Sequence, residues 1–252
     1  MKFLFPNNIY ARLLAQNFPD KYKSNILFDN AIAIASKLEN DPELVGLITP
    51  IDIIQHKDLF ISKSFGVSFN GDISNSYIYY AKDKQNIGEV YLAGDITSLE
   101  AMFTEIFFKE MYDVNVQLNI FKENKQLQNQ NVIIIGDGNF AADSFQMGTS
   151  FGSEMVDMLE MPFVNFVFAS STEENLKELN EELVGIEEKI YASIENGEAK
   201  LPFTDGSNSL IKDNISSVAF KFEEQDIEGI SQLIRLPYYY GKVDDITEVS
   251  FV

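Results

Sequence analysis

The chain has 252 residues, a formal net charge of −20, and 45% hydrophobic and 13% aromatic residues. This composition is that of a globular protein large enough to bury a core. The negative charge argues against the basic surface by which proteins bind nucleic acid or anionic membranes. Because the chain has no cysteine, disulfide bonds and thiolate metal sites are excluded.

We expect no targeting or membrane-spanning segment. Polar residues and Pro6 interrupt the apolar run at the N-terminus, and no stretch approaches the roughly 20 apolar residues that span a bilayer. The sequence therefore predicts a cytoplasmic protein without a membrane partner.

Short β-rich apolar runs alternate with helical patterns, which is typical of an α/β protein with parallel strands. The first cycle has these predicted elements: a strand at 2–5, a helix over 9–18, a strand and a helix within 24–40, and strands at 44–50, 59–71 and 76–83. The second cycle has these: a strand at 89–95, a helix over 97–112, strands at 114–121 and 131–138, a helix near 152–160 and a strand at 162–170.

The remainder of the chain is more charged and predicts one long helix over 171–197. Six apolar residues recur on one face of it at helical spacing: Leu176, Leu179, Leu183, Ile186, Ile190 and Ile194. Ser171 and Glu174 form a predicted capping box at its start, and Asn196-Gly197 ends it. A strand at 215–222 and a last helix over 226–241 follow.

The two cycles have no linker between them, so we expect two lobes whose chain crosses from one to the other more than once. The strands within 76–80 and 162–170 are the expected crossings, because each joins one cycle to the next. A second capping box, Thr97 with Glu100, gives the helix over 97–112 a definite start.

Several polar residues directly follow predicted strands, where ligands bind in open α/β sheets. The candidates are Asn7, Asn8, Thr97, Ser98, Gly136 and Asp137. Gly136 and Asp137 end a buried strand, and could form an ordinary turn or contact a ligand. The other four lie at predicted helix N-termini, whose free N–H groups and dipole favour an anion such as a carboxylate. Simple helix capping is the alternative for these four.

Residues 148–152, Gly-Thr-Ser-Phe-Gly, have the pattern of a serine-hydrolase nucleophile elbow around Ser150. The elbow needs a strand before the serine and a histidine later in the chain. The preceding segment reads as a loop, however, and the single histidine, His56, lies upstream. We expect a chance match. No metal site is expected either, because the acidic residues lack histidine spacing or a calcium-loop pattern.

Two blocks of the chain resemble the chorismate dehydratases of the futalosine route to menaquinone. That family has a strand ending in Ile-Gly-Asp, then Gly-Glu-Glu-Trp, then Gly-Leu-Pro-Phe-Val-Phe. The residues that match are Ile135, Gly136, Asp137, Gly152, Glu154, Met161, Pro162, Phe163 and Val164. The segments "GLITPIDIIQHKDLFI", "FGVSFNGDISNSYIYYAK" and "EEQDIEGISQLIRLPYYYGKV" are similar to family segments in the same order, so the resemblance covers nearly the whole chain.

The resemblance implies an α/β fold with two lobes, like the type II periplasmic binding proteins. Each lobe has a mixed sheet, two strands cross between the lobes, and the ligand lies between them. Residues 1–80 and 171–252 would form one lobe and residues 81–170 the other. The implied reaction is dehydration of chorismate to an enolpyruvyl-benzoate in menaquinone biosynthesis, without metal or organic cofactor.

The family's asparagine after the first strand maps to Asn8, and its serine before the crossing strand maps to Ser76. These two are the implied catalytic residues. The implied substrate contacts are Asn7, Ser74, Thr97, Ser98, Gly136 and Asp137, of which Asn7 and Ser74 are also alternatives for the asparagine and the serine.

The sequence departs from the family at several of its characteristic positions. Ser74 and Asn75 stand where the family has an arginine before the serine, and Met155 and Phe168 replace two tryptophans. A non-catalytic module of the same fold that binds a small carboxylate is therefore the alternative. Turnover of chorismate distinguishes the two hypotheses, and the oligomeric state is left open.

Overall fold

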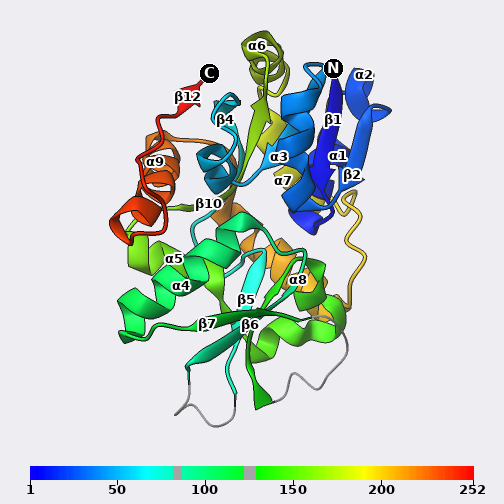
Figure 1. Cartoon of the computed structure of the whole chain (residues 1–252). Helices are drawn as coiled ribbons and strands as arrows, with labels where there is room; N and C mark the ends of the chain where they lie inside the picture. The colour runs from blue at the N-terminus through cyan, green and yellow to red at the C-terminus, as the bar shows by residue number, and fades with distance from the viewer. Residues whose placement is uncertain (82–86, 122–128) are drawn as a thin grey trace.

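The computed structural model describes residues 1–81, 87–121 and 129–252. The chain forms two lobes, each built around one β-sheet with helices packed against it, and both chain ends lie in the first lobe (Figure 1). The predicted α/β fold with two lobes is thus confirmed.

The first sheet has the strand order β2-β1-β3-β10-β4-β11, with β12 also paired to β4. Its strands are β1 (Lys2–Pro6), β2 (Ile26–Asp29), β3 (Leu44–Ile48), β4 (Phe60–Phe69), β10 (Phe163–Ser170), β11 (Val218–Lys221) and β12 (Ser250–Phe251). Strand β1 is parallel to β2 and β3, whereas β10 is antiparallel to β3 and β4. Strands β3 and β10 are buried along their whole length, which explains their continuous apolar sequence.

The second sheet has the order β7-β6-β8-β5-β9. Its strands are β5 (Ser76–Tyr79), β6 (Glu89–Gly94), β7 (Gln117–Ile120), β8 (Asn131–Ile135) and β9 (Thr149–Ser150). Strand β6 is parallel to β7 and β8, and β5 is antiparallel to β8. Both sheets are therefore mixed and share one arrangement: three parallel strands in the order second, first, third, then an antiparallel strand that enters from the other part of the chain.

The chain passes to the second sheet between Phe69 and Ser76 and returns between Leu159 and Phe163. The two strands that follow these passages are β5 and β10, which are the two crossover strands expected from the sequence. The lobe boundaries expected at residues 80 and 170 fall at the C-terminal ends of β5 and β10, whereas the chain passes between the sheets before each of these strands begins. Two residues of the predicted strand 76–83, residues 82 and 83, fall outside the described residues.

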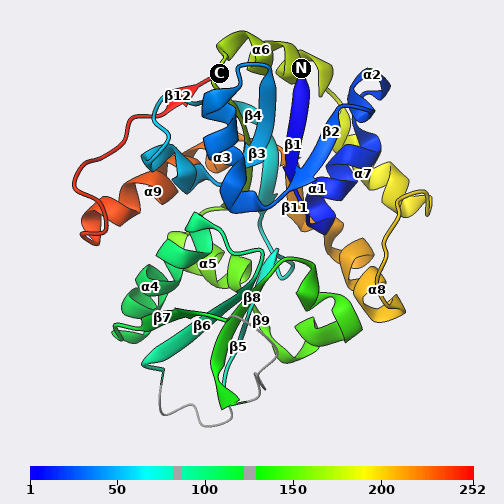
Figure 2. The same ribbon diagram turned by 45° about the vertical axis from the view of Figure 1, so that its right-hand side comes forward.

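Helices follow most of the strands and cover the sheets (Figures 1 and 2). They are α1 (Ile9–Asn17), α2 (Asp20–Lys23), α3 (Ala31–Asn40), α4 (Ser98–Tyr112), α5 (Phe151–Leu159), α6 (Glu173–Glu182), α7 (Ile186–Glu195), α8 (Asp205–Asn214) and α9 (Glu224–Tyr239). Short 3₁₀ helices are η1 (Pro50–Ile54), η3 (Asp137–Asn139), η4 (Ala141–Met147) and η5 (Ile215–Ser217).

The single long helix predicted over 171–197 is wrong in two respects. It is divided into α6 and α7 at Gly185, whose φ of 81° is left-handed and interrupts the helix at little cost because glycine has no Cβ. The helix also begins at Glu173, with Thr172 as an N-cap that makes no side-chain bond, so the capping box at Ser171 is not formed. The six apolar residues of the stripe are nevertheless all buried.

Candidate functional site

Asn8 lies between the lobes at the start of α1, shortly after β1. Asn8 is the N-cap of this helix, and its Oδ1 accepts a hydrogen bond of 3.0 Å from the backbone N–H of Ala11. This bond fixes the carboxamide, so that Nδ2 also lies at the first helical turn. Asn8 is 1% exposed, and its Nδ2 has no hydrogen-bond partner among the described residues. A buried unpaired donor is costly, which marks this position as a candidate contact for a ligand or water.

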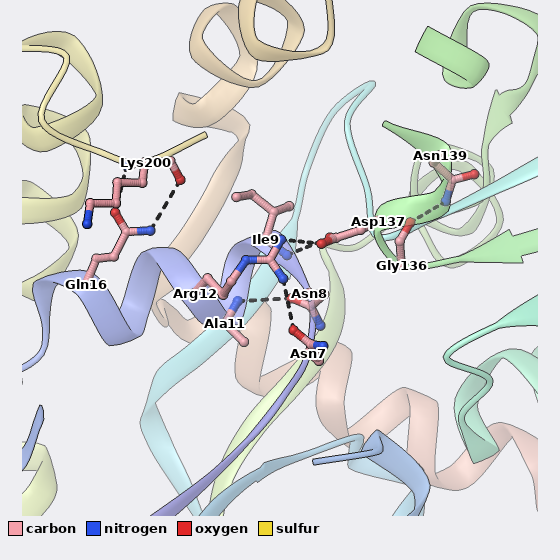
Figure 3. Close-up of polar contacts among 10 residues, drawn as sticks. All are labelled: Asn7, Asn8, Ile9, Ala11, Arg12, Gln16, Gly136, Asp137, Asn139 and Lys200. Atoms are coloured by element: carbon pink, nitrogen blue, oxygen red, sulfur yellow. Dashed lines mark hydrogen bonds and ion pairs between the residues drawn. The ribbon is translucent and has the colours of Figure 1, made fainter. Parts of the chain in front are cut away.

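Asp137 of the second lobe reaches this same helix terminus (Figure 3). Its Oδ1 accepts a hydrogen bond of 2.8 Å from the backbone N–H of Ile9, and its Oδ2 forms an ion pair with the Arg12 guanidinium. Asn7 Oδ1 accepts from Arg12 at 3.0 Å and helps to hold the guanidinium in place. The helix N-terminus and Arg12 therefore bind a carboxylate in this structure, and that carboxylate belongs to the protein itself.

The turn that carries Asp137 is fixed by backbone conformation and by Asn139. Gly136 has φ 86° and ψ −159°, a conformation that side chains with a Cβ rarely adopt. Its N–H donates to Asn75 O at 2.7 Å, and Asn139 Nδ2 donates to the carbonyls of Ile134 and Gly136 at 2.9 Å each. The buried Asn139 thus holds the turn that aims Asp137 at the first lobe.

Asp95 makes a second carboxylate contact between the lobes. It follows the end of β6, and its Oδ1 accepts a hydrogen bond of 3.3 Å from the backbone N–H of Ala31, the first residue of α3. Burial raises the pKa of Asp95, the Ala31 N–H opposes this, and the negative charges of Asp137 and Asp29 raise it further. Asp95 is thus harder to ionise than an ordinary aspartate.

Thr97 and Ser98 lie at the start of α4, as predicted, but their hydroxyls are engaged. Thr97 caps the helix by accepting from Leu99 N at 3.2 Å, and its hydroxyl is hydrogen-bonded to the Glu100 carboxyl. Glu100 is fully buried, and burial raises its pKa. Thr97 Oγ1 accepts from Leu99 N rather than from Glu100 N, and Glu100 bonds the hydroxyl rather than the backbone N–H of Thr97. The predicted capping box is therefore not formed, although Thr97 is the N-cap.

Ser98 connects the two lobes at η1. Its hydroxyl donates to Asp52 Oδ1 and lies 3.0 Å from Thr49 Oγ1. Asp52 Oδ2 also accepts from the backbone N–H and hydroxyl of Thr49, both at 2.9 Å. Burial raises the pKa of Asp52, while the bonds from Ser98 and Thr49 oppose that shift. Here a carboxylate of the first lobe meets a helix terminus of the second.

The two candidate serines differ in what their hydroxyls do. Ser74 Oγ donates to Ser76 O at 2.6 Å and accepts from Ser150 Oγ and Gly152 N, at 3.1 and 3.2 Å. A Cβ at Gly152 would lie 2.5 Å from Ser74 Cβ, so glycine is needed for this close approach. Ser76 Oγ, by contrast, is buried and has no hydrogen-bond partner within the described ranges. Ser74 therefore joins the crossing to α5, whereas the Ser76 hydroxyl lacks a partner and is only a candidate contact for a ligand.

The structure gives Ser150 a capping role and not a nucleophilic one. Its Oγ accepts from Ser153 N at 3.1 Å and caps α5. His56 lies in the first lobe, with Nδ1 2.9 Å from Glu39 Oε2. Residues 140–146, which were expected to form a loop, lie mostly in η4, and the serine itself ends the short strand β9.

An open cavity of about 620 Å³ adjoins Asp137 on the side of α8. Its lining residues are Asp137, Gly138, Ala141, Ala142, Pro202, Phe203 and Thr204. Asp143, next to this lining, accepts hydrogen bonds from the hydroxyls of Thr204 and Ser207 at the start of α8. A third aspartate of the second lobe therefore occupies a helix N-terminus contributed by the C-terminal part of the chain.

Arg12 and Asp95 are among the residues between the lobes that were missed in the sequence. Arg12 is one of only two arginines in the chain and lies four residues after Asn8, on the same helix face. Asp95 directly follows a predicted strand, as Asp137 does. The spacing of Arg12 from Asn8 and the position of Asp95 after a strand can both be read in the sequence, but neither indicates which groups meet between the lobes.

In the described part of the chain, no group of three or more His, Asp or Glu side chains could hold a metal ion. No helix within the same residues is long and apolar enough to cross a membrane.

Solved structures of other proteins share this fold. The chain is similar to the periplasmic aliphatic sulphonate binding protein SsuA of Escherichia coli, with a TM-score of 0.65 and 11% identity over 99% of this chain and 90% of that one. It is similar to protein AF1704 of Archaeoglobus fulgidus, with a TM-score of 0.58 and 11% identity over 96% and 98% of the two chains. A Thermoplasma volcanium protein provisionally named for nitrate transport has a TM-score of 0.50 and 14% identity over 100% and 96%.

The chain therefore has the fold of the type II periplasmic binding proteins, with a mixed sheet in each lobe, as predicted. At these identities the likeness concerns the fold alone. No protein-family model matches the sequence, and no curated protein matches it either.

Proposed function

We propose that this protein binds a small organic acid between its two lobes. The observation that carries the proposal is the carboxylate of Asp137 on the N-terminus of α1. The Ile9 N–H and the Arg12 guanidinium already bind a carboxylate there, and Asn8 Nδ2 offers a further unpaired donor. A hydrogen bond in which one partner is ionised is stronger than one between neutral groups, and both the helix N-terminus and the arginine offer such bonds to a carboxylate.

In this proposal the ligand carboxylate takes the place of Asp137 when the lobes separate. Ser74 and Asn75 stand where the dehydratases that this sequence resembles have an arginine. In this proposal Arg12 supplies the positive charge that is missing at that position. The guanidinium projects from α1, one turn after Asn8, and it is partly shielded from water, with 24% of its side chain exposed. It can therefore supply Coulomb support despite the net charge of −20.

Thermal unfolding in the presence of small organic acids, chorismate included, tests this proposal. A ligand that binds only the folded protein raises its stability by mass action. Arg12→Gln should weaken binding by about 10-fold or more, because a charge-assisted bond is lost. Arg235→Gln is the matched control, since Arg235 is the only other arginine and is exposed on α9. If Arg12→Gln and Arg235→Gln bind the acids equally well, the site lies elsewhere.

A second candidate function is dehydration of chorismate, which the family resemblance implies. The observation that favours it is the pair of buried unpaired groups, Asn8 Nδ2 and Ser76 Oγ, at the two positions that match the family's catalytic residues. Loss of water makes the ring aromatic, so the reaction runs downhill. The protein would orient the substrate and assist removal of a ring proton and departure of hydroxide.

The assay is the disappearance of chorismate and the appearance of an aromatic absorbance. Ser76→Ala should lower the rate on the order of 100-fold if its hydroxyl positions the substrate, whereas Ser36→Ala, on the exposed side of α3, should leave it unchanged. Stabilisation by chorismate without turnover would favour a binding module, and no conversion at high protein concentration would exclude the dehydratase.

A further inference from the structure

At η1 a hydroxyl of the second lobe, Ser98, donates to a carboxylate of the first, Asp52. At the N-termini of α1 and α3 the hydrogen-bonding groups of the two lobes are divided the other way. The first lobe contributes donors: the Arg12 guanidinium and the backbone N–H groups of Ile9 and Ala31. The second lobe contributes acceptors: the carboxylates of Asp137 and Asp95. In the structure each donor faces one of these two carboxylates, so the lobes satisfy one another directly.

The two carboxylates are neighbours. Strands β6 and β8 are paired in parallel, with Gly94 opposite Ile135, so Asp95 and the Gly136-Asp137 turn follow adjacent strand ends. A Cβ at Gly136 would lie 3.8 Å from Asp95 Cβ, and Asp95 N donates to Ile135 O at 3.2 Å. A ligand that enters between the lobes therefore meets two aspartates side by side.

Unpaired neutral groups follow the same division. Asn8 Nδ2, on the first lobe, is a donor without a partner, and Asn75 Oδ1, beside the second-lobe turn, is an acceptor without one, as far as the described residues go. Both residues are almost fully buried, with 1% and 2% of their surface exposed. Asn75 borders the turn directly, because its carbonyl accepts from Gly136 N. These two groups have no partner in the described arrangement of the lobes, so they point to an occupant that offers both an acceptor and a donor.

A ligand that carries only negative charge would satisfy half of this junction. It could replace Asp137 on Arg12 and on the N-terminus of α1, but Asp137 and Asp95 would then lie unpaired beside a further anion. A carboxylate left without a partner in an occluded site bears the full desolvation cost, and like charges add repulsion. A ligand that also carries a cationic group avoids both penalties.

We propose that the ligand is zwitterionic, with a carboxylate that binds Arg12, Ile9 N–H and Asn8 Nδ2 and an ammonium group that binds Asp137 and Asp95. An amino acid or a compound built on one has this chemistry. The inference rests on the proposed function only in that the ligand site lies between the lobes, and it replaces a simple acid by an acid that bears an amine.

Three matched sets of probes test the inference by thermal unfolding: the proteinogenic amino acids, the 2-oxo acids that lack their amine, and the amines that lack their carboxylate. We expect the amino acids to raise the melting temperature more than either of the other sets. If the 2-oxo acids stabilise the protein as well as the amino acids do, the zwitterion is excluded while acid binding stands. If neither set stabilises it, both proposals are overturned.

Variants of the two aspartates give an independent test with the best amino acid and its 2-oxo acid. Asp137→Asn should weaken amino-acid binding by about 10- to 100-fold, through loss of a charge-assisted bond, and should strengthen binding of the 2-oxo acid. Asp95→Asn should act in the same direction, and it serves if Asp137→Asn fails to fold. Asp157→Asn, an exposed change of the same charge on the second lobe, is the control. Parallel losses for both ligands would contradict the inference.

Discussion

The two lobes share one strand order but present opposite chemistry to each other at the N-termini of α1 and α3. Strands β1 and β6 hold equivalent places in their sheets, each being parallel to its two neighbours. After β1 come two asparagines and a helix whose first N–H groups face the second lobe, whereas after β6 comes Asp95, whose carboxylate faces the first. The common topology therefore fixes where groups meet, and single residues at strand ends decide the polarity of each face.

This difference explains how a strongly acidic chain keeps its lobes together. Aspartates of the second lobe occupy helix N-termini, where the partial positive charge of the helix dipole stabilises a carboxylate. Further ties lie outside the junction, from Tyr240 and Lys242, beyond α9, to Glu110 and Glu105 of α4. Carboxylates of the second lobe thus stabilise the contact between the lobes, although the chain as a whole is strongly acidic.

The largest effect is expected from Asp137→Arg, which breaks the complementarity outright. The new guanidinium would face Arg12 and the N-terminus of α1, so the lobes should separate. Because the chain has no cysteine, Ser36→Cys on the first lobe and Asn115→Cys on the second can carry two spin labels. Pulsed EPR should show a longer and broader distance in Asp137→Arg than in the labelled parent. An unchanged distance would mean that this pair does not hold the lobes.

Reversing both charges sharpens the same comparison. Arg12→Asp combined with Asp137→Arg restores an ion pair, although the helix N-terminus then faces a cation. We expect partial recovery of the short distance and a coupling free energy of about 0.5–3 kcal/mol in a double-mutant cycle. Additive effects of the two changes would show that the residues act independently.

A smaller effect should separate the two serines of the crossing. Ser74→Ala removes the partner of Ser150 Oγ and Gly152 N–H and should lower the free energy of unfolding by about 1–3 kcal/mol. Ser76→Ala removes a buried hydroxyl that has no partner in the described residues, so stability should change by less than about 0.5 kcal/mol or rise. Urea unfolding measures both, and a larger loss for Ser76→Ala would reverse these assignments.

The smallest effect is the pH dependence of stability from Asp95 and Asp143. Burial raises the pKa of Asp95 in the folded protein. At pH values above the ordinary aspartate pKa of about 3.9, the folded protein therefore keeps the Asp95 proton more often than the unfolded chain does. The Asp95 contribution to stability is therefore lost with rising pH, and the advantage of Asp95→Asn over the parent should grow.

Asp143 provides the opposite control for that measurement. Hydrogen bonds from Thr204 and Ser207 lower its pKa, so its contribution to stability is present above the ordinary aspartate value and is lost as pH falls. The stability of Asp143→Asn relative to the parent should consequently fall as pH rises toward that value. Thermal unfolding of the variants between pH 3 and 7 compares the two, and slopes of the same sign would contradict this account.

Local patterns predicted much of the fold because their causes are local. Thr97 starts α4, as its hydroxyl and the apolar spacing indicated, and the stripe from Leu176 to Ile194 is buried. The break at Gly185 was missed because the apolar period continues across it, and periodicity does not register one left-handed residue. Helix α8 was not predicted at all, although Thr204 is its N-cap.

The sequence by itself determined the alternation of strands and helices, the start of α4 at Thr97, and the neutral donors that follow β1. Only the tertiary structure decided that Asp137 occupies the N-terminus of α1, 128 positions away in the chain, and that Asp95 does the same at α3. Strand pattern and capping depend on residues within a few positions of one another. Which carboxylate meets which helix depends on how two sheets are placed, and that follows from packing across the whole molecule.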